Sequence, residues 1–105
     1  METARTQYEL TACAKGSAAD ADKLLNNSYK AVLQYLCPDE RALLVASERA
    51  WLAFRDADCA FWGGAGGTIA PMNEAICRAD RSRERAQQLD GWPPNSARAN
   101  MVSCK

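Results

Sequence analysis

The chain has 105 residues, the length of a single domain, and its 13 basic and 13 acidic residues give a formal charge of zero. A nucleic-acid partner calls for a clustered excess of basic side chains, so the balanced charge argues against one. The chain contains no histidine and no Cys-x-x-Cys motif. It therefore lacks nearly every zinc signature and the Ser–His–Asp and Cys–His catalytic arrangements, and we expect neither a metal nor a cofactor.

The five cysteines are many for a chain of this length, and they indicate disulfides. Disulfides form in oxidising compartments, which predicts a periplasmic or secreted protein. The segment from Met1 to Gln7 lacks the apolar stretch of a signal peptide, so we interpret Met1 as a start residue added to a mature chain whose export signal has been removed. No apolar run approaches about 18 residues, and we expect no membrane span.

A first helical segment is predicted from Thr6 to Leu36, and its pattern is stronger from Ala18 onward. Ser17 or Asp20 would cap the stronger half, and Gly16 makes a kink or a break near this point an open alternative. One face carries the residues expected to be buried, which are Ala21, Leu25, Ser28 or Tyr29, Val32 and Leu36.

A second helix is predicted from Pro38 to about Phe61. Pro38 ends the preceding helix and suits the first position of this one, and the glycine-rich segment Gly63–Gly67 stops it. The residues expected to face the core recur with a helical period and are Leu43, Ala46 or Ser47, Ala50, Phe54 and Ala57.

A third helix is predicted to begin at Pro71 and to end at Gly91, which Pro93 and Pro94 follow. Its expected buried face consists of Met72, Ala75 or Ile76, Ala79, Ser82, Ala86 and Leu89. The tail from Asn95 to Lys105 has no periodicity and is expected to lie along the surface, and no segment shows the alternation of a strand.

These elements predict an all-α antiparallel bundle of three main helices. The short connection at Cys37-Pro38 makes the first two helices antiparallel neighbours. Cys59 ends the second helix and Cys77 lies early in the third, so a disulfide between them would staple the third helix alongside the second. We expect one domain over residues 1–105, with a core over 6–90 and an irregular tail over 91–105.

The other three cysteines leave alternatives open. On one continuous helix Cys13 and Cys37 would lie about 36 Å apart at 1.5 Å per residue, too far to pair. The third helix returns near Cys37, so we prefer Cys37–Cys104, with Cys13 free or bridging to a second molecule. Cys13–Cys104 is the rival pairing if the tail runs back along the bundle.

Paired carboxylates are the first candidates for catalysis, because a glycosidase needs two of them facing each other across a cleft. Asp56 and Asp58 are two residues apart on a helix and point to different faces, as do Asp20 and Asp22. We therefore expect no catalytic site.

Arg55 lies beside Asp56, and Asp22 belongs to the neighbouring helix, so we interpret these three side chains as an ion-pair set that fixes the helix register. The basic run from Arg78 to Arg85 contains Asp80 and Glu84 at spacings that allow pairing along the helix, and we expect a solvated face.

The loop Gly63–Thr68 is rich in glycine, but it has no Gly-Lys-Ser/Thr ending and no preceding strand, so a phosphate cradle is disfavoured. We expect a loop closed by the disulfide. Trp51 and Trp92 are expected to pack inside the protein, whereas Trp62 beside the loop is the tryptophan that best suits a binding role.

Three motifs together resemble a known family. They are Ala21-Asp22-x-x-Leu25-Asn26-x-x-Tyr29, then Arg49-Ala-Trp51-x-x-x-Arg55-Asp56-x-x-Cys59, and, after the glycine loop and Cys77, Arg83-x-Arg85-x-x-x-Leu89. In this order they resemble the LprI-like lysozyme inhibitor domain of exported bacterial proteins, and the resemblance covers Thr6 to Leu89.

The resemblance implies a non-enzymatic protein that binds a lysozyme-type cell-wall hydrolase and occludes its cleft. An immunity protein against a rival bacterium's toxin, or a structural envelope protein without an enzyme partner, are the alternatives. The candidate contact is the loop from Trp62 to Asn73, with Thr68 and Asn73 as hydrogen-bonding groups. We expect the motif residues to be structural rather than part of the binding surface; these are Asp22, Asn26, Tyr29, Trp51, Arg55 and Asp56.

Overall fold

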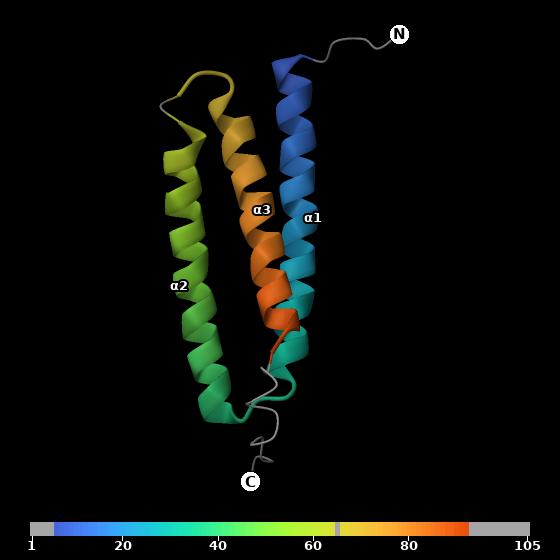
Figure 1. The fold of residues 1–105 in the computed structure, drawn as a ribbon, viewed down its shortest axis with the longest axis vertical. Helices are drawn as coiled ribbons and strands as arrows, with labels where there is room; N and C mark the ends of the chain where they lie inside the picture. The colour runs from blue at the N-terminus through green and yellow to red at the C-terminus, as the bar shows by residue number, and fades with distance from the viewer. Residues whose placement is uncertain (1–5, 65, 93–105) are drawn as a thin grey trace.

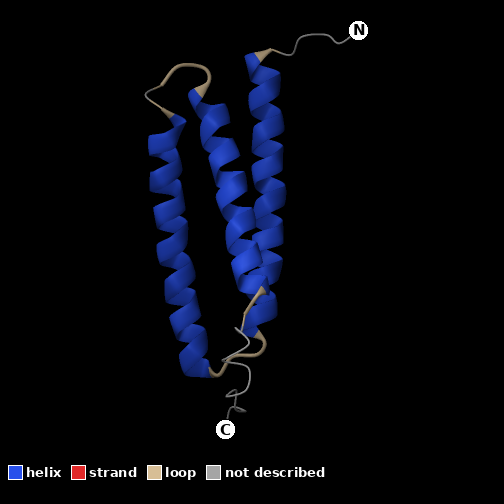
Figure 2. Ribbon diagram, in the orientation of Figure 1, coloured by secondary structure: helices blue, strands red, loops and turns tan. Residues whose placement is uncertain are grey.

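Three helices form the protein in a computed structural model, which describes residues 6–64 and 66–92 (Figure 1). The helices are α1 (Gln7–Leu33), α2 (Pro38–Gly63) and α3 (Ala70–Asp90), and in Figure 1 they run down, up and down. Within the described ranges no residue belongs to a strand (Figure 2). The predicted all-α antiparallel bundle is therefore confirmed.

The start of α1 agrees with the predicted start at Thr6, and the alternative of a break near Gly16 is wrong. Thr6 caps the helix: its hydroxyl accepts a hydrogen bond from the Glu9 amide at 3.1 Å, and the Thr6 amide donates to the Glu9 carboxylate at 2.9 Å. This reciprocal pair satisfies two helix-end amides, so the helix begins here, and Ser17 and Asp20 lie inside it and are not caps. The helix then continues through Gly16 without a break, because the packing of α1 against α3 outweighs the weak helix propensity of one glycine.

The capping pair gives a first testable prediction. Hydrogen bonds from the Thr6 amide, and then from its hydroxyl, lower the pKa of Glu9 below its ordinary value. A lowered pKa in the folded state means that Glu9 supports the helix start above its unfolded pKa and loses this effect as the pH falls through the folded pKa. In a Thr6→Ala variant, whose hydroxyl is gone, an NMR titration should find the Glu9 pKa closer to the ordinary value. An unchanged pKa would contradict the capping role.

The connection between α1 and α2 is tied by side chains. The Cys37 amide donates to the Glu40 carboxylate at 3.0 Å, and Pro38 takes the first helical position of α2 as predicted. The Nε of Arg41 donates to the carbonyls of Leu33 and Leu36 at 3.2 and 3.0 Å, so it satisfies acceptors that the end of α1 leaves open. The turn therefore holds α2 antiparallel to α1.

The hydrophobic core lies between α1 and α3, which pack together most closely. The predicted buried face of α1 is confirmed. That of α3 is confirmed, with Ala75 buried and Ile76 exposed, except at Met72, which is only half-buried. Small residues such as Ala79, Ser82 and Ala86 let the two helix backbones approach. The central cluster consists of Leu25, Val32, Leu36, Ala86 and Leu89.

The predicted inward face of α2 is wrong. Leu43 and Phe54 are exposed, and so are Ala46, Ser47, Ala50 and Ala57. The buried positions of α2 are instead Glu48, Arg55, Cys59 and Gly63. Burying this face is possible because α1 and α3 supply partners for its polar side chains, which the apolar periodicity of α2 alone does not reveal.

The neighbour of α2 also differs from the expectation. α3 lies between α1 and α2 and packs against both (Figure 1). α1 and α2 are antiparallel as predicted, but they do not pack closely against each other, so the simple helical hairpin is wrong. The side of α2 that faces α1 borders an open groove.

The loop between α2 and α3 is closed by the predicted disulfide. Cys59 and Cys77 are bonded, with their Cα atoms 5.5 Å apart, and Cys59 is completely buried. Gly64, Gly66 and Gly67 have positive φ angles of 96°, 111° and 83°. Residues with a side chain rarely adopt such angles, whereas glycine adopts them readily. The glycines therefore allow the tight reversal that brings α3 back along α2.

Candidate functional site

Arg55 is the polar centre of the three helices. Its side chain is 9% exposed, and its Nη1 donates to Asp22 of α1 at 2.9 Å and to Ser82 of α3 at 3.1 Å. The Nε donates to Asp56 at 3.0 Å, and the Ser82 hydroxyl donates to Asp22 at 3.1 Å. One guanidinium thus joins α2 to both other helices, using the planar set of donors that only arginine has.

Ion pairs continue along the seam between α2 and α3. Arg85 pairs with Glu48 at 2.9 Å, and both side chains are nearly buried. Arg81 pairs with Asp58 at 2.9 Å, and the Nε of Arg78 lies 3.5 Å from Asp56. We call these three pairs, together with Arg55 and Asp22, the ion-pair ladder.

The ladder corrects the interpretation of the basic run as a solvated face. Three of its arginines, Arg78, Arg81 and Arg85, pair with carboxylates of α2. Among the ion pairs of this run, only that between Arg81 and Glu84, at 3.9 Å, follows the helix as predicted. The sequence of the basic run does not show that acidic residues of α2 lie opposite it in the fold. The pairing between helices could therefore not be predicted from the run alone.

Trp51 is half-buried beside the ladder. The guanidinium carbons of Arg55 and Arg85 lie 5.7 and 5.8 Å from its ring centroid, within the range of cation–π attraction. Tyr29 and Trp51 both pack against the hydrophobic core cluster. The aromatic members of the motif therefore lie between the core and the ladder.

An open groove of about 470 Å³ separates α1 from α2. Asp22, Asn26 and Arg55 line it, so motif residues reach both the ladder and this surface. The remaining lining residues are Leu25, Tyr29, Val45, Glu48, Arg49 and Leu52.

A second surface lies at the end of the bundle that carries the glycine loop. Trp62 is 62% exposed, and its Nε1 donates to Asp58 at 3.2 Å. Phe61, also exposed, meets it edge to face with the ring centroids 5.0 Å apart. Trp62 and Asn73 line one hollow of about 430 Å³, whereas the exposed Thr68 is not among its lining residues.

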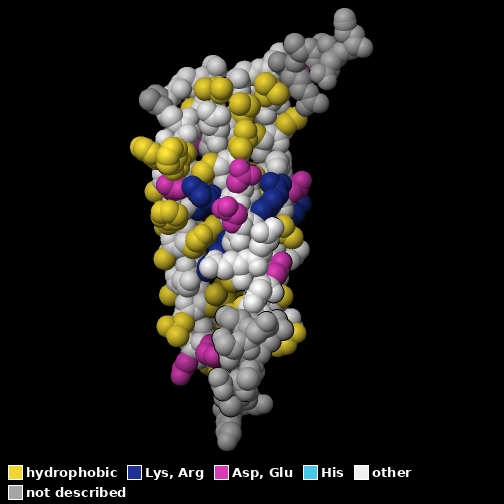
Figure 3. All heavy atoms as spheres, viewed as in Figure 1, with side chains coloured by type: hydrophobic (Ala, Val, Ile, Leu, Met, Phe, Trp, Pro, Cys, Tyr) yellow, Lys and Arg dark blue, Asp and Glu magenta, His cyan; other side chains and the backbone are white. Residues whose placement is uncertain are grey.

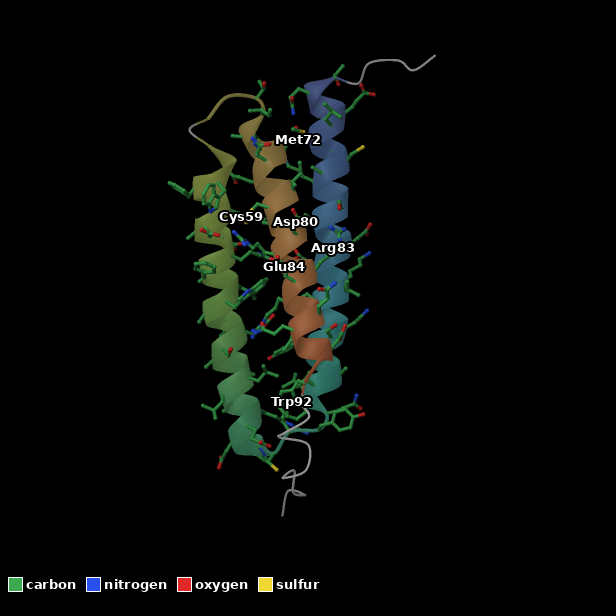
Figure 4. The ribbon with its side chains drawn as sticks, viewed as in Figure 1. Cys59, Met72, Asp80, Arg83, Glu84 and Trp92 are labelled. Atoms are coloured by element: carbon green, nitrogen blue, oxygen red, sulfur yellow. A yellow bond between two sulfur atoms is a disulfide. The ribbon has the colours of Figure 1, made fainter. Side chains whose placement is uncertain are left out.

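Other residues of this hollow were not predicted to be contact residues. Ile76, Asp80 and Glu84 line it together with Cys77 and Arg81. Figure 4 shows Asp80 and Glu84 on the same side of α3, and Figure 3 shows acidic side chains there below a hydrophobic patch. Their spacing from Asn73 could have predicted that they line the same surface, since residues three and four positions apart share one face of a helix. We call Trp62, Asn73, Ile76, Asp80 and Glu84 the loop-end surface.

Three further expectations concern the remaining cysteines with the tail, metal binding and membrane spans. The pairings Cys37–Cys104 and Cys13–Cys104 involve a residue outside the described part, as does the tail, so they stay predictions. Among the described residues, no group of three or more acidic or cysteine side chains is placed to hold a metal ion. None of the three helices combines the length and apolar character needed to cross a membrane.

The fold and its contacts define a small helical protein held by the Cys59–Cys77 disulfide and an inter-helix ion-pair ladder. The chain belongs to the lysozyme inhibitor LprI family, whose model matches residues 1–89. An uncharacterised protein of Rhizobium meliloti (strain 1021) is 29% identical over 99 residues, which cover 80% of this chain and 71% of that protein. No solved structure matches the chain. The family match confirms the resemblance of the motifs.

Proposed function

We propose that this chain is a non-enzymatic inhibitor that binds a lysozyme-type cell-wall hydrolase in the periplasm or outside the cell. Membership in the lysozyme inhibitor LprI family, over residues 1–89, is the observation that supports this proposal. The disulfide is consistent with an oxidising compartment.

The loop-end surface is the proposed contact with the hydrolase. An exposed tryptophan is among the strongest anchors of protein interfaces, and here Trp62 is held by Asp58, Phe61 and the nearby disulfide. Since Trp62 is anchored before a partner arrives, little side-chain freedom is lost on binding. The amide of Asn73 and the hydroxyl of Thr68 supply donors for the carboxylates of a lysozyme cleft.

Charge also supports this surface. Asp80 and Glu84 are both exposed beside Trp62, and Glu84 has only a long contact, of 3.9 Å, with Arg81. Exposed carboxylates attract a cationic enzyme and speed its association. A cationic lysozyme is therefore the preferred member of the target class.

The contact is tested by a Trp62→Ala substitution. Loss of an anchor residue should raise the inhibitor concentration needed for half inhibition by about thirtyfold, while the melting temperature stays close to that of the unmodified chain because Trp62 is largely exposed. The measurement is the residual muramidase activity of a panel of lysozymes titrated with each variant.

Tyr35→Ala is the matched control, because Tyr35 is an exposed aromatic residue in the turn after α1, at the end of the bundle opposite the glycine loop. It should inhibit like the unmodified chain. Equal inhibition by the Trp62 variant would move the contact elsewhere. If the chain inhibits no muramidase but neutralises a bacterial toxin, an immunity function replaces the proposed one. If it binds neither a muramidase nor a toxin, a structural role in the envelope replaces it.

We further propose that Asp22, Asn26, Tyr29, Trp51, Arg55 and Asp56 are scaffold residues of this inhibitor. The contacts of Arg55 with Asp22 and Asp56 support the proposal for these three residues, and packing against the core cluster supports it for Tyr29 and Trp51. Asn26 is exposed on the groove beside Asp22, and its scaffold role rests on this position alone. A substitution in this group should therefore lower affinity only as far as it lowers folding.

A further inference from the structure

The outer face of α2 has an apolar surface without a partner in the described chain. We define this outer face by residues that follow the helical period and are all exposed, namely Leu43, Ala46, Ser47, Ala50, Ala53, Phe54, Ala57, Ala60 and Phe61. It contains no charged residue. Figure 3 shows hydrophobic side chains recurring along the α2 edge of the molecule.

The large members of this face are far from buried. Leu43 and Phe61 are each 72% exposed, and Phe54 is 60% exposed. Their separation along the helix, from residue 43 to residue 61, is about 27 Å at 1.5 Å per residue. Single exposed apolar residues are common, but a continuous face of this length marks an interaction site.

We infer that this face binds the same face of a second copy of the chain, with the two α2 helices antiparallel. The pattern of side-chain sizes supports a two-fold axis near residue 52. About this axis Phe54 of each copy lies opposite Ala50 of the other, and Phe61 lies opposite Leu43. Each large ring then meets a smaller residue, which is what close packing of two helices requires.

A parallel pair fits less well. It would place Phe54 opposite Phe54 and Ala50 opposite Ala50, so that crowded layers would alternate with empty ones. The antiparallel arrangement avoids both faults with the same residues.

Charges at one edge of the face also match in the antiparallel arrangement. Arg49 is exposed, and the Asp56 side chain, which pairs with Arg55 and Arg78 of its own chain, is still 47% exposed. With the two-fold axis near residue 52, Arg49 of one copy and Asp56 of the other are offset along the helices by only about one residue. Both lie on the same edge of the outer face. Two such pairs arise by symmetry and favour this register.

The area suffices for a specific interface. A phenylalanine has roughly 200 Å² of surface, so the exposed portions of the four phenylalanines in a dimer contribute roughly 500 Å². The two Leu43 side chains and the alanines of both helices raise the total to the order of 1,000 Å², where specific interfaces begin. A weak dimer, formed at micromolar or higher concentration, is therefore expected.

The dimer is tested by sedimentation of the whole chain over a concentration series. The unmodified chain should show a mass that rises to twice that of one chain, and Phe54→Glu should weaken dimerisation at least about tenfold, because each substitution enters the interface twice. Tyr35→Glu, at an exposed aromatic residue away from the face, should dimerise normally. Both variants should melt like the unmodified chain, which separates lost association from lost folding.

The orientation is tested with a short bismaleimide cross-linker. Ala53→Cys places two thiols near the proposed axis, about 3 Å apart along the helices, whereas Ala46→Cys places them about 18 Å apart. Only Ala53→Cys should give a cross-linked dimer above the level of the unmodified chain. Cross-linking of both variants would indicate a parallel pair, and a chain that stays monomeric at all concentrations, or a heterologous partner on this face, would overturn the proposal.

Discussion

Removal of the Cys59–Cys77 disulfide should destabilise the protein by about 3 kcal/mol. The bond closes a loop with a sequence separation of 18 residues, and the loss of unfolded-state entropy for a loop of this length corresponds to about that free energy. For a chain of this size the melting temperature should fall by roughly 15 °C in a Cys59→Ala, Cys77→Ala double variant, as measured by circular dichroism.

The same double variant also tests the loop-end surface. Cys77 lines the hollow beside Trp62, so without the staple the position of Trp62 relative to α3 is held less firmly. Inhibition of the target should weaken even at a temperature where the variant is fully folded. A variant that melts within a few degrees of the unmodified chain would show that the disulfide is not a main source of stability.

Substitution of Arg55 by alanine should lower the free energy of unfolding by about 2–3 kcal/mol. The substitution leaves Ser82, which is completely buried, with fewer partners, and it removes the guanidinium that joins Asp22 of α1 to α2. It also opens a gap against the ring of Trp51. A fall in melting temperature of roughly 10 °C is expected, measured by thermal unfolding.

Arg83→Ala is the matched control for this substitution. Arg83 is an exposed arginine of α3 that donates one hydrogen bond, to Ser17 of α1 at 2.9 Å. Its removal should shift the melting temperature by no more than a few degrees, because an exposed hydrogen bond contributes little. An Arg55 variant that melts normally yet no longer binds its target would assign the ladder to the binding surface.

Local signals in the sequence determined much of this protein. Pro38 marks the start of α2, and the glycines between positions 63 and 67 mark its end. Both residue types restrict or free the local backbone angles, so their effect can be predicted without knowledge of the fold. The buried faces of α1 and α3 were also predictable, since each has one dominant apolar stripe. The positions of Cys59 and Cys77, at facing helix ends, were enough to predict their bond.

The contacts of Arg55 with Asp22 and Asp56 were predictable in part. An arginine beside one carboxylate, with another carboxylate on a neighbouring helix, indicated an ion-pair set. Ser82 was expected to be buried, but its hydrogen bonds in this set were not expected, because its partners belong to two other helices.

Only the tertiary structure decided how α2 is turned. Its apolar stripe, which includes Leu43 and Phe54, predicted an inward face, yet the helix buries Glu48 and Arg55 instead. A buried charge is tolerated only where a partner neutralises it, and for Glu48 that partner is Arg85 of α3. Periodicity along one helix records which residues share a face, but not what lies opposite, so the ladder and the exposed outer face of α2 follow from the packing of all three helices together.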